Sequence, residues 1–258
     1  MSIKHFVRKW LNCNGWDVSR FDPLRSEACR LVRQLGSHGA PTVFDVGANT
    51  GQFAQKLRDG GFRGRIVSFE ASSAAHANLK KNATRDADWI VAPQMASGDR
   101  NGTVSLNIAG NSASSSVLPM LPSHVVADPK SRYTGSEMVE LRTLDNVAKE
   151  FVSGANGVFL KLDVQGMEYQ VLQGASQFID NVVGIQAELS LVPLYEGERL
   201  FDDMFHELET RGFDLWSLVP GFINPDTGRL LQLDAIFFRK QARYPSLEAK
   251  SDLVAVQY

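Results

Sequence analysis

The chain has 258 residues and a formal net charge of −2, and 43% of its residues are hydrophobic and 22% charged. This length suits one large α/β domain and is too short for two comfortable ones, and the composition argues against a disordered chain. The small net charge provides no basic field, which argues against a dedicated nucleic-acid-binding protein.

The cysteines and the apolar runs indicate in which cellular compartment the protein is expected. Cys13 and Cys29 lack the spacing of a metal or redox motif, and nothing points to an oxidising compartment, although the sequence leaves a disulfide between them open. No apolar run approaches the about 20 residues that a membrane span needs. The N-terminus has no apolar core followed by a cleavage site, so we expect no signal peptide and a cytoplasmic enzyme.

Residues 1–40 are expected to form a helical extension. Apolar residues at positions 3, 6, 7, 10 and 11 recur at helical spacing, with basic residues between them. Such a helix rests on a membrane surface, closes over a substrate, or caps the edge of its own domain. We favour the cap, because one short helix has little membrane affinity by itself. A second helix is expected over residues 25–35, ending at Gly36.

Residues 42–53, TVFDVGANTGQF, predict a buried strand, a glycine-rich turn and the start of a helix. Asp45 is a lone acid within the apolar run, and Gly47 and Gly51 bracket the turn, where the backbone adopts φ > 0 or passes close to something. This combination is typical of a site for a nucleotide-type ligand, because backbone N–H groups and the positive end of the helix point at the ligand.

Strands and helices alternate along the rest of the chain. We expect strands at 65–70, 89–95, 103–108, 137–142, 158–164, 182–189, 213–219 and 234–239, and helices at 52–58, 73–83, 144–149, 168–178 and 200–211. Residues 111–129 form a long irregular segment, which is usually functional or mobile. The last two strands have no helix between them, so one should run antiparallel in an otherwise parallel, doubly wound sheet. Class I methyltransferases, which use S-adenosylmethionine, have this arrangement.

Three acids lie at or near the C-terminal ends of predicted parallel strands: Asp45, Glu70 and Asp163. Ligands of open α/β sheets bind outside these ends, where the strand order reverses. Glu70 belongs to the strand next to that of Asp45, where an acid can accept both hydroxyls of a ribose. Each acid could instead be a helix cap or a surface residue, but three at equivalent positions favour a binding site.

The glycine-rich turn narrows the type of ligand. A dinucleotide fingerprint would have glycine where this chain has Asn49, and the Gly-Lys-Ser/Thr of a P-loop is absent. A ligand with ribose and adenine but no phosphate fits better, and S-adenosylmethionine is such a ligand. Asp45 and the turn around Gly47 can supply the acid and the backbone donors that its amino and carboxylate groups need.

Six segments, in order, resemble the FkbM family of methyltransferases: FDVGANTGQF (44–53), VSFEA (67–71), MASGDRNG (95–102), VELRTLDNV (139–147), LKLDVQGMEYQVLQGA (160–175) and IQAELSLVPLYEG (185–197). The resemblance implies an α/β, Rossmann-like class I methyltransferase fold with a mostly parallel seven-stranded sheet. It also implies S-adenosylmethionine as cofactor and methyl transfer to a hydroxyl of a sugar, a polysaccharide or glycolipid unit, or a natural product. We therefore expect a methyltransferase domain over 41–240, between the extension and a tail at 241–258.

By motif, the resemblance also assigns the cofactor contacts. Asp45, Gly47, Asn49, Gly51 and Phe53 would line the cofactor, Glu70 would hold its ribose, and Ser97 would flank its adenine. We also expect Ala48, Ala71 and Asp163 to bind the cofactor.

A sugar hydroxyl is a poor nucleophile at neutral pH, so a base or a metal ion helps. Asp163 ends the strand expected beside the opening strand, and Glu188 ends the next, so the two carboxylates are expected to lie close. They would share a proton, which makes one of them a base, or bind a divalent cation. Alternatively, Asp163 orients the amine of the cofactor and Glu188 caps the next element. His124, in the irregular segment, is a further candidate base, and no residue is assigned as a metal ligand.

Two rival functions stay open at this point. Asn49 counts against an NAD-type oxidoreductase, and Asp163 counts against a non-catalytic protein that binds an adenosyl ligand. The partner that we expect is a small-molecule or glycan acceptor and not a nucleic acid, and peripheral membrane contact is left open. The sequence predicts neither the acceptor nor the oligomeric state.

Overall fold

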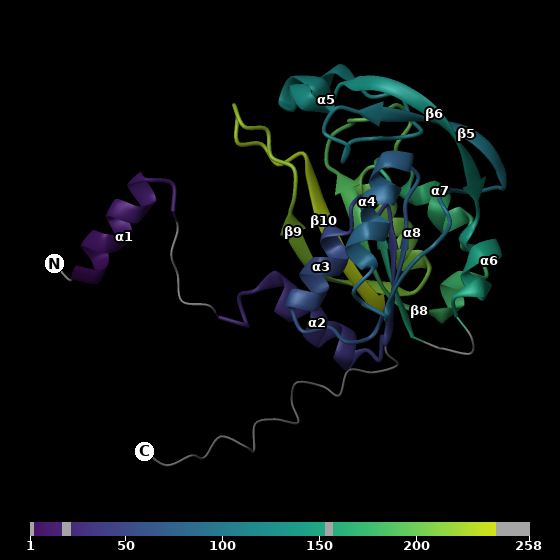
Figure 1. The fold of residues 1–258 in the computed structure, drawn as a ribbon, viewed down its shortest axis with the longest axis horizontal. Helices are drawn as coiled ribbons and strands as arrows, with labels where there is room; N and C mark the ends of the chain where they lie inside the picture. Colours follow the sequence, from purple (N-terminus) through teal and green to yellow (C-terminus); the bar gives the residue numbers. More distant parts are fainter. Residues whose placement is uncertain (1–2, 17–21, 153–156, 241–258) are drawn as a thin grey trace, which may run out of the picture.

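The computed structural model describes residues 3–16, 22–152 and 157–240, and it is built around a seven-stranded sheet (Figure 1). The strand order is β3-β2-β1-β7-β8-β10-β9. The strands are β1 (Thr42–Val46), β2 (Arg65–Phe69), β3 (Trp89–Val91), β7 (Val158–Leu162), β8 (Val182–Ser190), β9 (Phe213–Pro220) and β10 (Gln232–Arg239).

The direction of the strands confirms the predicted fold class. β1 pairs in parallel with β2 on one side and β7 on the other, whereas β10 is antiparallel to both β8 and β9. The chain leaves β1 towards β2 and β3 and returns through β7 and β8, so the strand order reverses between β1 and β7. Ligands of such sheets bind at this reversal, beyond the carboxyl ends of the strands.

Helices cover both faces of the sheet. One face packs against α2 (Glu27–Ser37), α3 (Gln52–Asp59) and α4 (Ser73–Ala83), and the other against α6 (Leu144–Val147), α7 (Glu168–Gln173) and α8 (Phe201–Thr210). Successive strand residues point to opposite faces, so Val43 belongs to the first core and Phe44 to the second. Short 3₁₀ turns follow at η1 (Pro129–Ser131), η2 (Ala148–Glu150) and η3 (Phe178–Asn181).

A second sheet of three strands arches over one end of the central sheet (Figure 1). It contains β4 (Ala96–Ser97), β6 (Tyr133–Arg142) and β5 (Gly102–Ala109), in that order. The strand predicted over 89–95, with an interruption at Pro93, is present but shorter: β3 ends at Val91, before Pro93, which cannot donate to a strand ladder. The segment predicted to be irregular contains a short helix, α5 (Pro122–Ala127).

The N-terminal helix is present as α1 (Ile3–Cys13). Contrary to the prediction, it does not cap the edge of the sheet. Figure 1 shows it apart from the domain. Its described residues contribute to none of the hydrophobic clusters, and Trp10 is 60% exposed. Cys13 and Cys29 are both free. The predicted tail, 241–258, lies outside the described residues.

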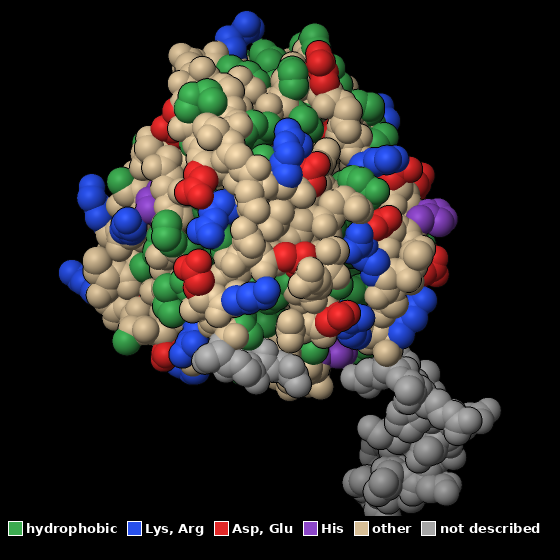
Figure 2. Space-filling view, turned by 90° about the vertical axis from the view of Figure 1, so that its right-hand side faces the viewer, with side chains coloured by type: hydrophobic (Ala, Val, Ile, Leu, Met, Phe, Trp, Pro, Cys, Tyr) green, Lys and Arg blue, Asp and Glu red, His purple; other side chains and the backbone are tan. Residues whose placement is uncertain are grey.

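The surface mixes both signs of charge. Figure 2 shows lysine and arginine side chains interspersed with aspartate and glutamate on the face turned to the viewer. Within the part of the chain that the structure describes, no helix is both long and apolar enough to cross a membrane.

Candidate active site

A pocket with a volume of about 380 Å³ lies at the carboxyl ends of β1, β2 and β7, where the strand order reverses. Its position is that of ligand sites in open α/β sheets. Of the residues predicted for the site, those that line this pocket are Gly47, Ala48, Asn49, Phe53, Glu70, Ala71, Ser97, Asp163 and Glu188.

The turn after β1 brings the backbone against the loop after β7. Gly47 has φ 81°, and a Cβ atom at this position would lie 1.8 Å from the carbonyl oxygen of Asp163. Only glycine avoids both the strain and the clash. Asn49 also has a positive φ, 48°, in the left-handed region that asparagine tolerates. The glycine-rich turn therefore packs directly against the loop that carries Asp163.

Glu70 ties the turn to the end of β2. Its Oε2 accepts a hydrogen bond from the Asn49 N–H at 2.7 Å, and its Oε1 accepts one from the Ser72 N–H at 2.7 Å. The side chain is buried, and this burial raises the pKa of Glu70, while the backbone donors work in the opposite direction. Each carboxylate oxygen accepts up to two hydrogen bonds, so the carboxylate keeps capacity for the hydroxyl groups of a ligand.

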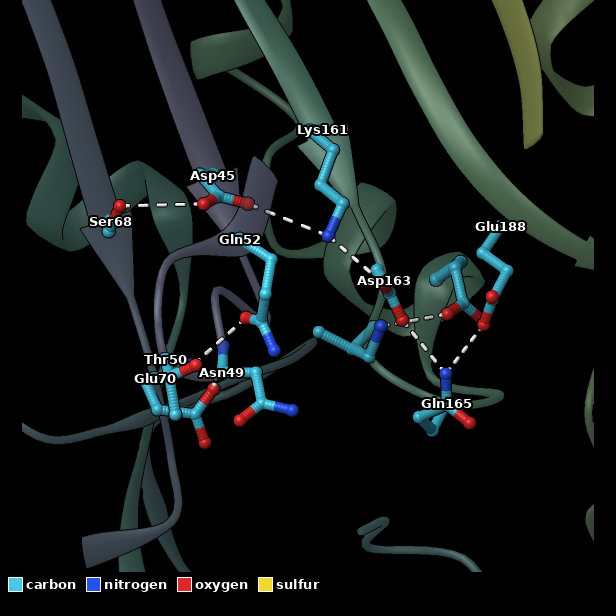
Figure 3. Close-up of polar contacts among 12 residues, drawn as sticks. Asp45, Asn49, Thr50, Gln52, Ser68, Glu70, Lys161, Asp163, Gln165 and Glu188 are labelled. Atoms are coloured by element: carbon cyan, nitrogen blue, oxygen red, sulfur yellow. Dashed lines mark hydrogen bonds and ion pairs between the residues drawn. The ribbon is translucent and has the colours of Figure 1, made fainter. Parts of the chain in front are cut away.

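A buried polar row crosses the sheet below the pocket (Figure 3). Lys161 Nζ lies 3.5 Å from Asp45 Oδ1 and 2.9 Å from Asp163 Oδ2, while the Ser68 hydroxyl donates to Asp45 Oδ2 at 3.4 Å. Asp45 is the register partner of both Ser68 and Lys161 on the neighbouring strands, so the three side chains share one face of the sheet. Burial raises the pKa of Asp45. Burial alone would lower the pKa of Lys161, but the two acids outweigh it and hold that pKa above its usual value.

The two carboxylates that we expected to lie close are joined by one amide. Gln165 Nε2 donates to Asp163 Oδ1 at 2.8 Å and to Glu188 Oε2 at 2.5 Å (Figure 3). Gln165 has φ 54°, outside the usual regions for a residue with a side chain, and such conformations concentrate at functional sites. Glu188 lies within β8, two residues before its end, and faces Asp234 in the register with β10. Burial, followed by the charges of Asp163 and Asp234, raises the pKa of Glu188 well above its usual value.

Three predicted residues lie outside the pocket lining. Asp45 is inside the sheet, and Gly51 packs under the Trp89 ring, which a Cβ atom would approach to 2.5 Å. His124 is buried in α5, where its ring lies against Tyr195 and Phe222. The sequence pattern indicated the end of a strand or a polar segment, but not the direction in which each side chain points. Direct contact of these three side chains with a ligand in the pocket is therefore not expected.

Other lining residues were not assigned from the sequence. Lys161 had a visible signal, a lysine within the apolar strand VFLKLDV, and Gln165 follows directly after this strand. Gln186 and Asp234 reach the pocket because β8 and β10 lie side by side, which the sequence order does not show. Among the residues that the structure describes, no group of three His, Cys, Asp or Glu side chains could hold a metal ion.

Comparison with known proteins identifies relatives of this chain. The family model described as "Methyltransferase FkbM domain" matches residues 45–215. The 2-O-methyltransferase NoeI of Sinorhizobium fredii is 26% identical over 178 residues, which cover 66% of this chain and 71% of that protein. The methyltransferase sdnD of Sordaria araneosa is 26% identical over 215 residues, covering 74% of this chain and 79% of that protein.

Solved structures with a similar fold are more distant in sequence. The methyltransferase FkbM from Methylobacillus flagellatus KT is 14% identical with a TM-score of 0.47, over 76% of this chain and 43% of that one. This chain therefore spans less than half of that structure. The magnesium protoporphyrin IX methyltransferase from Synechocystis PCC 6803, solved with bound SAM, is 12% identical with a TM-score of 0.44, over 93% of this chain and 98% of that one.

Proposed function

The chain belongs to the FkbM family of methyltransferases, whose methyl donor is S-adenosylmethionine, and on that premise we propose that it methylates a hydroxyl oxygen. The acceptor that we propose is a sugar, a polysaccharide or glycolipid unit, or a natural product. The family match covers residues 45–215, which include every residue that lines the pocket except Asp234. Membership of this family favours methyl transfer over the two rival functions, an NAD-type oxidoreductase and a non-catalytic adenosyl-binding protein.

The donor side of the pocket has the chemistry that S-adenosylmethionine needs. When bound, this cofactor supplies a methyl group on a positively charged sulfur. We propose that Glu70 accepts hydrogen bonds from its ribose and that the apolar side chains of Met95, Leu106 and Val117, which line the pocket, cover its adenine. Asp163 is proposed to face its amino group. The pocket therefore offers a hydrogen-bond acceptor to the ribose, apolar surface to the adenine, and a carboxylate to the amino group.

The observation that carries oxygen methylation is the pair of carboxylates in the same pocket, Asp163 and Glu188, joined through Gln165. A hydroxyl loses a proton when it is methylated, so a carboxylate within reach accelerates the reaction as a general base. The remaining task of the pocket is to align the hydroxyl with the methyl group at near-attack distance. One relative at 26% identity is named a 2-O-methyltransferase, which supports an oxygen acceptor here.

Calorimetry and label transfer test this proposal in two steps. First, titration with S-adenosylmethionine should show binding in the micromolar range. Second, label from the methyl group should pass to a panel of methyl glycosides, or to extracts of the source organism fractionated into glycolipid, polysaccharide and small molecules. Label in a hydroxyl-bearing fraction supports the proposal. Absence of binding at high micromolar concentration, or transfer to amines alone, contradicts it.

A further inference from the structure

Asp163 and Glu188, the two pocket carboxylates joined through Gln165, differ in which of their oxygens remain free to bind a ligand. Asp163 uses both of its oxygens: Oδ2 lies 2.9 Å from Lys161 Nζ, and Oδ1 accepts from Gln165 Nε2 at 2.8 Å. Glu188 uses only Oε2, which accepts from Gln165 at 2.5 Å and from Gln232 Nε2 at 3.3 Å. Within the described residues, no side-chain or backbone donor reaches Glu188 Oε1. Glu188 therefore keeps a whole oxygen for a ligand in the pocket that it lines.

Asp163 and Glu188 also differ in whether a positively charged side chain pairs with the carboxylate. Asp163 forms an ion pair with Lys161, whose side chain is only 7% exposed, so this pair is little screened by water. Among the described residues, no lysine, arginine or histidine forms an ion pair with Glu188. The charged groups that influence it from the surrounding elements are Asp163, Asp234, Glu168 and Lys161. Three acids thus face Glu188, and the one cation is already bonded to Asp163.

Gln165 fixes this difference in place. Its Oε1 accepts from the hydroxyl of the buried Tyr195 at 2.6 Å, so its NH₂ group must turn towards the carboxylates. Its two hydrogens then serve one acid each. The Ser116 hydroxyl donates to the backbone oxygen of Gln165 at 2.6 Å and holds the strained residue from the other side. While Gln165 stays in this position, Asp163 keeps its ion pair with Lys161, and Glu188 keeps its Oε1 free.

We propose that Glu188 is the catalytic base of the methyl transfer. Asp163, which is held in place by Lys161 and Gln165, instead contacts the methyl donor. This inference rests on the function proposed above. As the bond between the acceptor oxygen and the methyl carbon forms, the carbon–sulfur bond breaks and its electron pair passes to sulfur. The O–H bond of the acceptor breaks, its electron pair stays on oxygen, and the proton moves to Glu188 Oε1. Glu188 suits this role because its Oε1 is free in the pocket, no cation forms an ion pair with it, and its half-buried position removes part of its hydration.

The test compares Glu188→Gln with Asp163→Asn in the full chain. In Glu188→Gln we expect kcat to fall about 10²–10⁴-fold, while the affinity for S-adenosylmethionine stays within about twofold by calorimetry. The decline of the wild-type rate towards acid pH should disappear in this variant. In Asp163→Asn the decline should persist and the affinity for S-adenosylmethionine should fall. Glu196→Gln, the same substitution at an exposed glutamate outside the pocket, is the matched control.

Two results would overturn the inference. One is a Glu188→Gln enzyme that keeps both its kcat and its acid decline, and the other is loss of that decline in Asp163→Asn. Should Glu188→Gln not fold, Glu188→Asp replaces it, and we expect this variant to show a smaller loss of kcat and to keep the decline in rate towards acid pH.

If the wild type binds S-adenosylmethionine but methylates nothing in the panel, the proposed function is contradicted while the role of Glu188 is still to be tested. NMR of isotope-labelled glutamate carboxyls then tests Glu188 without an acceptor, and titration at the ordinary glutamate pKa of about 4.3 refutes its role.

Discussion

Asp45 and Lys161 face each other as register partners on adjacent strands at the centre of the sheet, with the carboxylate and the ammonium 3.5 Å apart. Asp45 is fully buried, and the Lys161 side chain is 7% exposed. A charge removed from water to this degree is tolerated only with a partner. Asp45 therefore does not line the pocket but pairs with Lys161, which does, whereas Gly47 and Asn49 of the same sequence motif line the pocket directly.

The first prediction follows from this pair. Lys161→Met leaves Asp45 buried without a cation, and breaking a buried ion pair in this way costs about 3–5 kcal/mol of unfolding free energy. The measurement is urea denaturation. Lys56→Met is the matched control, because Lys56 pairs with Glu27 at the surface with its side chain 48% exposed, where such pairs contribute about 0–1 kcal/mol. Equal losses in the two variants would show that Asp45 does not depend on Lys161.

A second prediction concerns the close approach at the turn. Gly47→Ala forces a Cβ atom to within 1.8 Å of the Asp163 carbonyl oxygen, at a residue with φ 81°. The backbone strain alone costs about 1–3 kcal/mol, and the clash must also displace the loop that carries Asp163. We expect loss of S-adenosylmethionine binding in calorimetry together with a lowered midpoint of unfolding.

Gly212→Ala separates the two causes. Gly212 has nearly the same φ, 85°, but a Cβ atom there meets nothing within 4 Å. This variant should lose only the strain, about 1–3 kcal/mol, and should bind S-adenosylmethionine normally. A Gly47→Ala protein that binds as tightly as Gly212→Ala would mean that the turn and the Asp163 loop need no such contact.

The order and type of the strands and helices could be predicted because they follow from local sequence patterns. Alternating strands and helices indicated the parallel sheet, and the missing helix before the last strand indicated that one of the last two strands is antiparallel, which the structure identifies as β10. The second sheet was not predicted as such, because β4 has only two residues and its pairing of Ala96 with Leu141 joins distant parts of the chain. Local propensity carries no information on such a contact.

The site was predictable to the extent that it follows from strand ends. Glu70 and Asp163 follow directly after β2 and β7 and reach the pocket, whereas Asp45 lies one residue before the end of β1 and is buried within the sheet. Lys161 and Asp234 enter the site through the lateral order of β1, β7, β8 and β10. That order depends on which strands pair, which a single sequence does not state.

A third prediction concerns the stability of the loop after β7 at different pH. Glu168 is buried and accepts hydrogen bonds from the N–H groups of Val164 at 2.9 Å and Gly166 at 3.0 Å. Burial raises the pKa of Glu168 to about 7, against the opposing effect of backbone N–H donors such as that of Val164. Since the folded pKa lies above the unfolded one, the contribution to stability is fully present below about pH 4.5 and is lost as the pH rises through about 7.

The variant Glu168→Gln isolates this group, because other titrations affect both proteins alike. The unfolding free energy of the wild type, relative to Glu168→Gln, should fall by about 3 kcal/mol between about pH 4.5 and about pH 8. Urea denaturation at several pH values measures the difference. A difference that stays constant with pH would show that the two backbone donors keep Glu168 ionised throughout.

The final prediction tests the donor end of the pocket. Glu70 accepts from two backbone N–H groups with its two oxygens, so Glu70→Gln turns an NH₂ group towards one donor and removes the charge-assisted hydrogen bonds. A loss of about 1–3 kcal/mol weakens S-adenosylmethionine binding about 5–150-fold, which calorimetry resolves. The control is Glu137→Gln, since Glu137 also accepts from a backbone N–H at the start of α4, that of Ser73 at 2.7 Å, but lies outside the pocket. A control that weakens binding as much as Glu70→Gln would place the effect in the fold of α4 and not in contact with the cofactor.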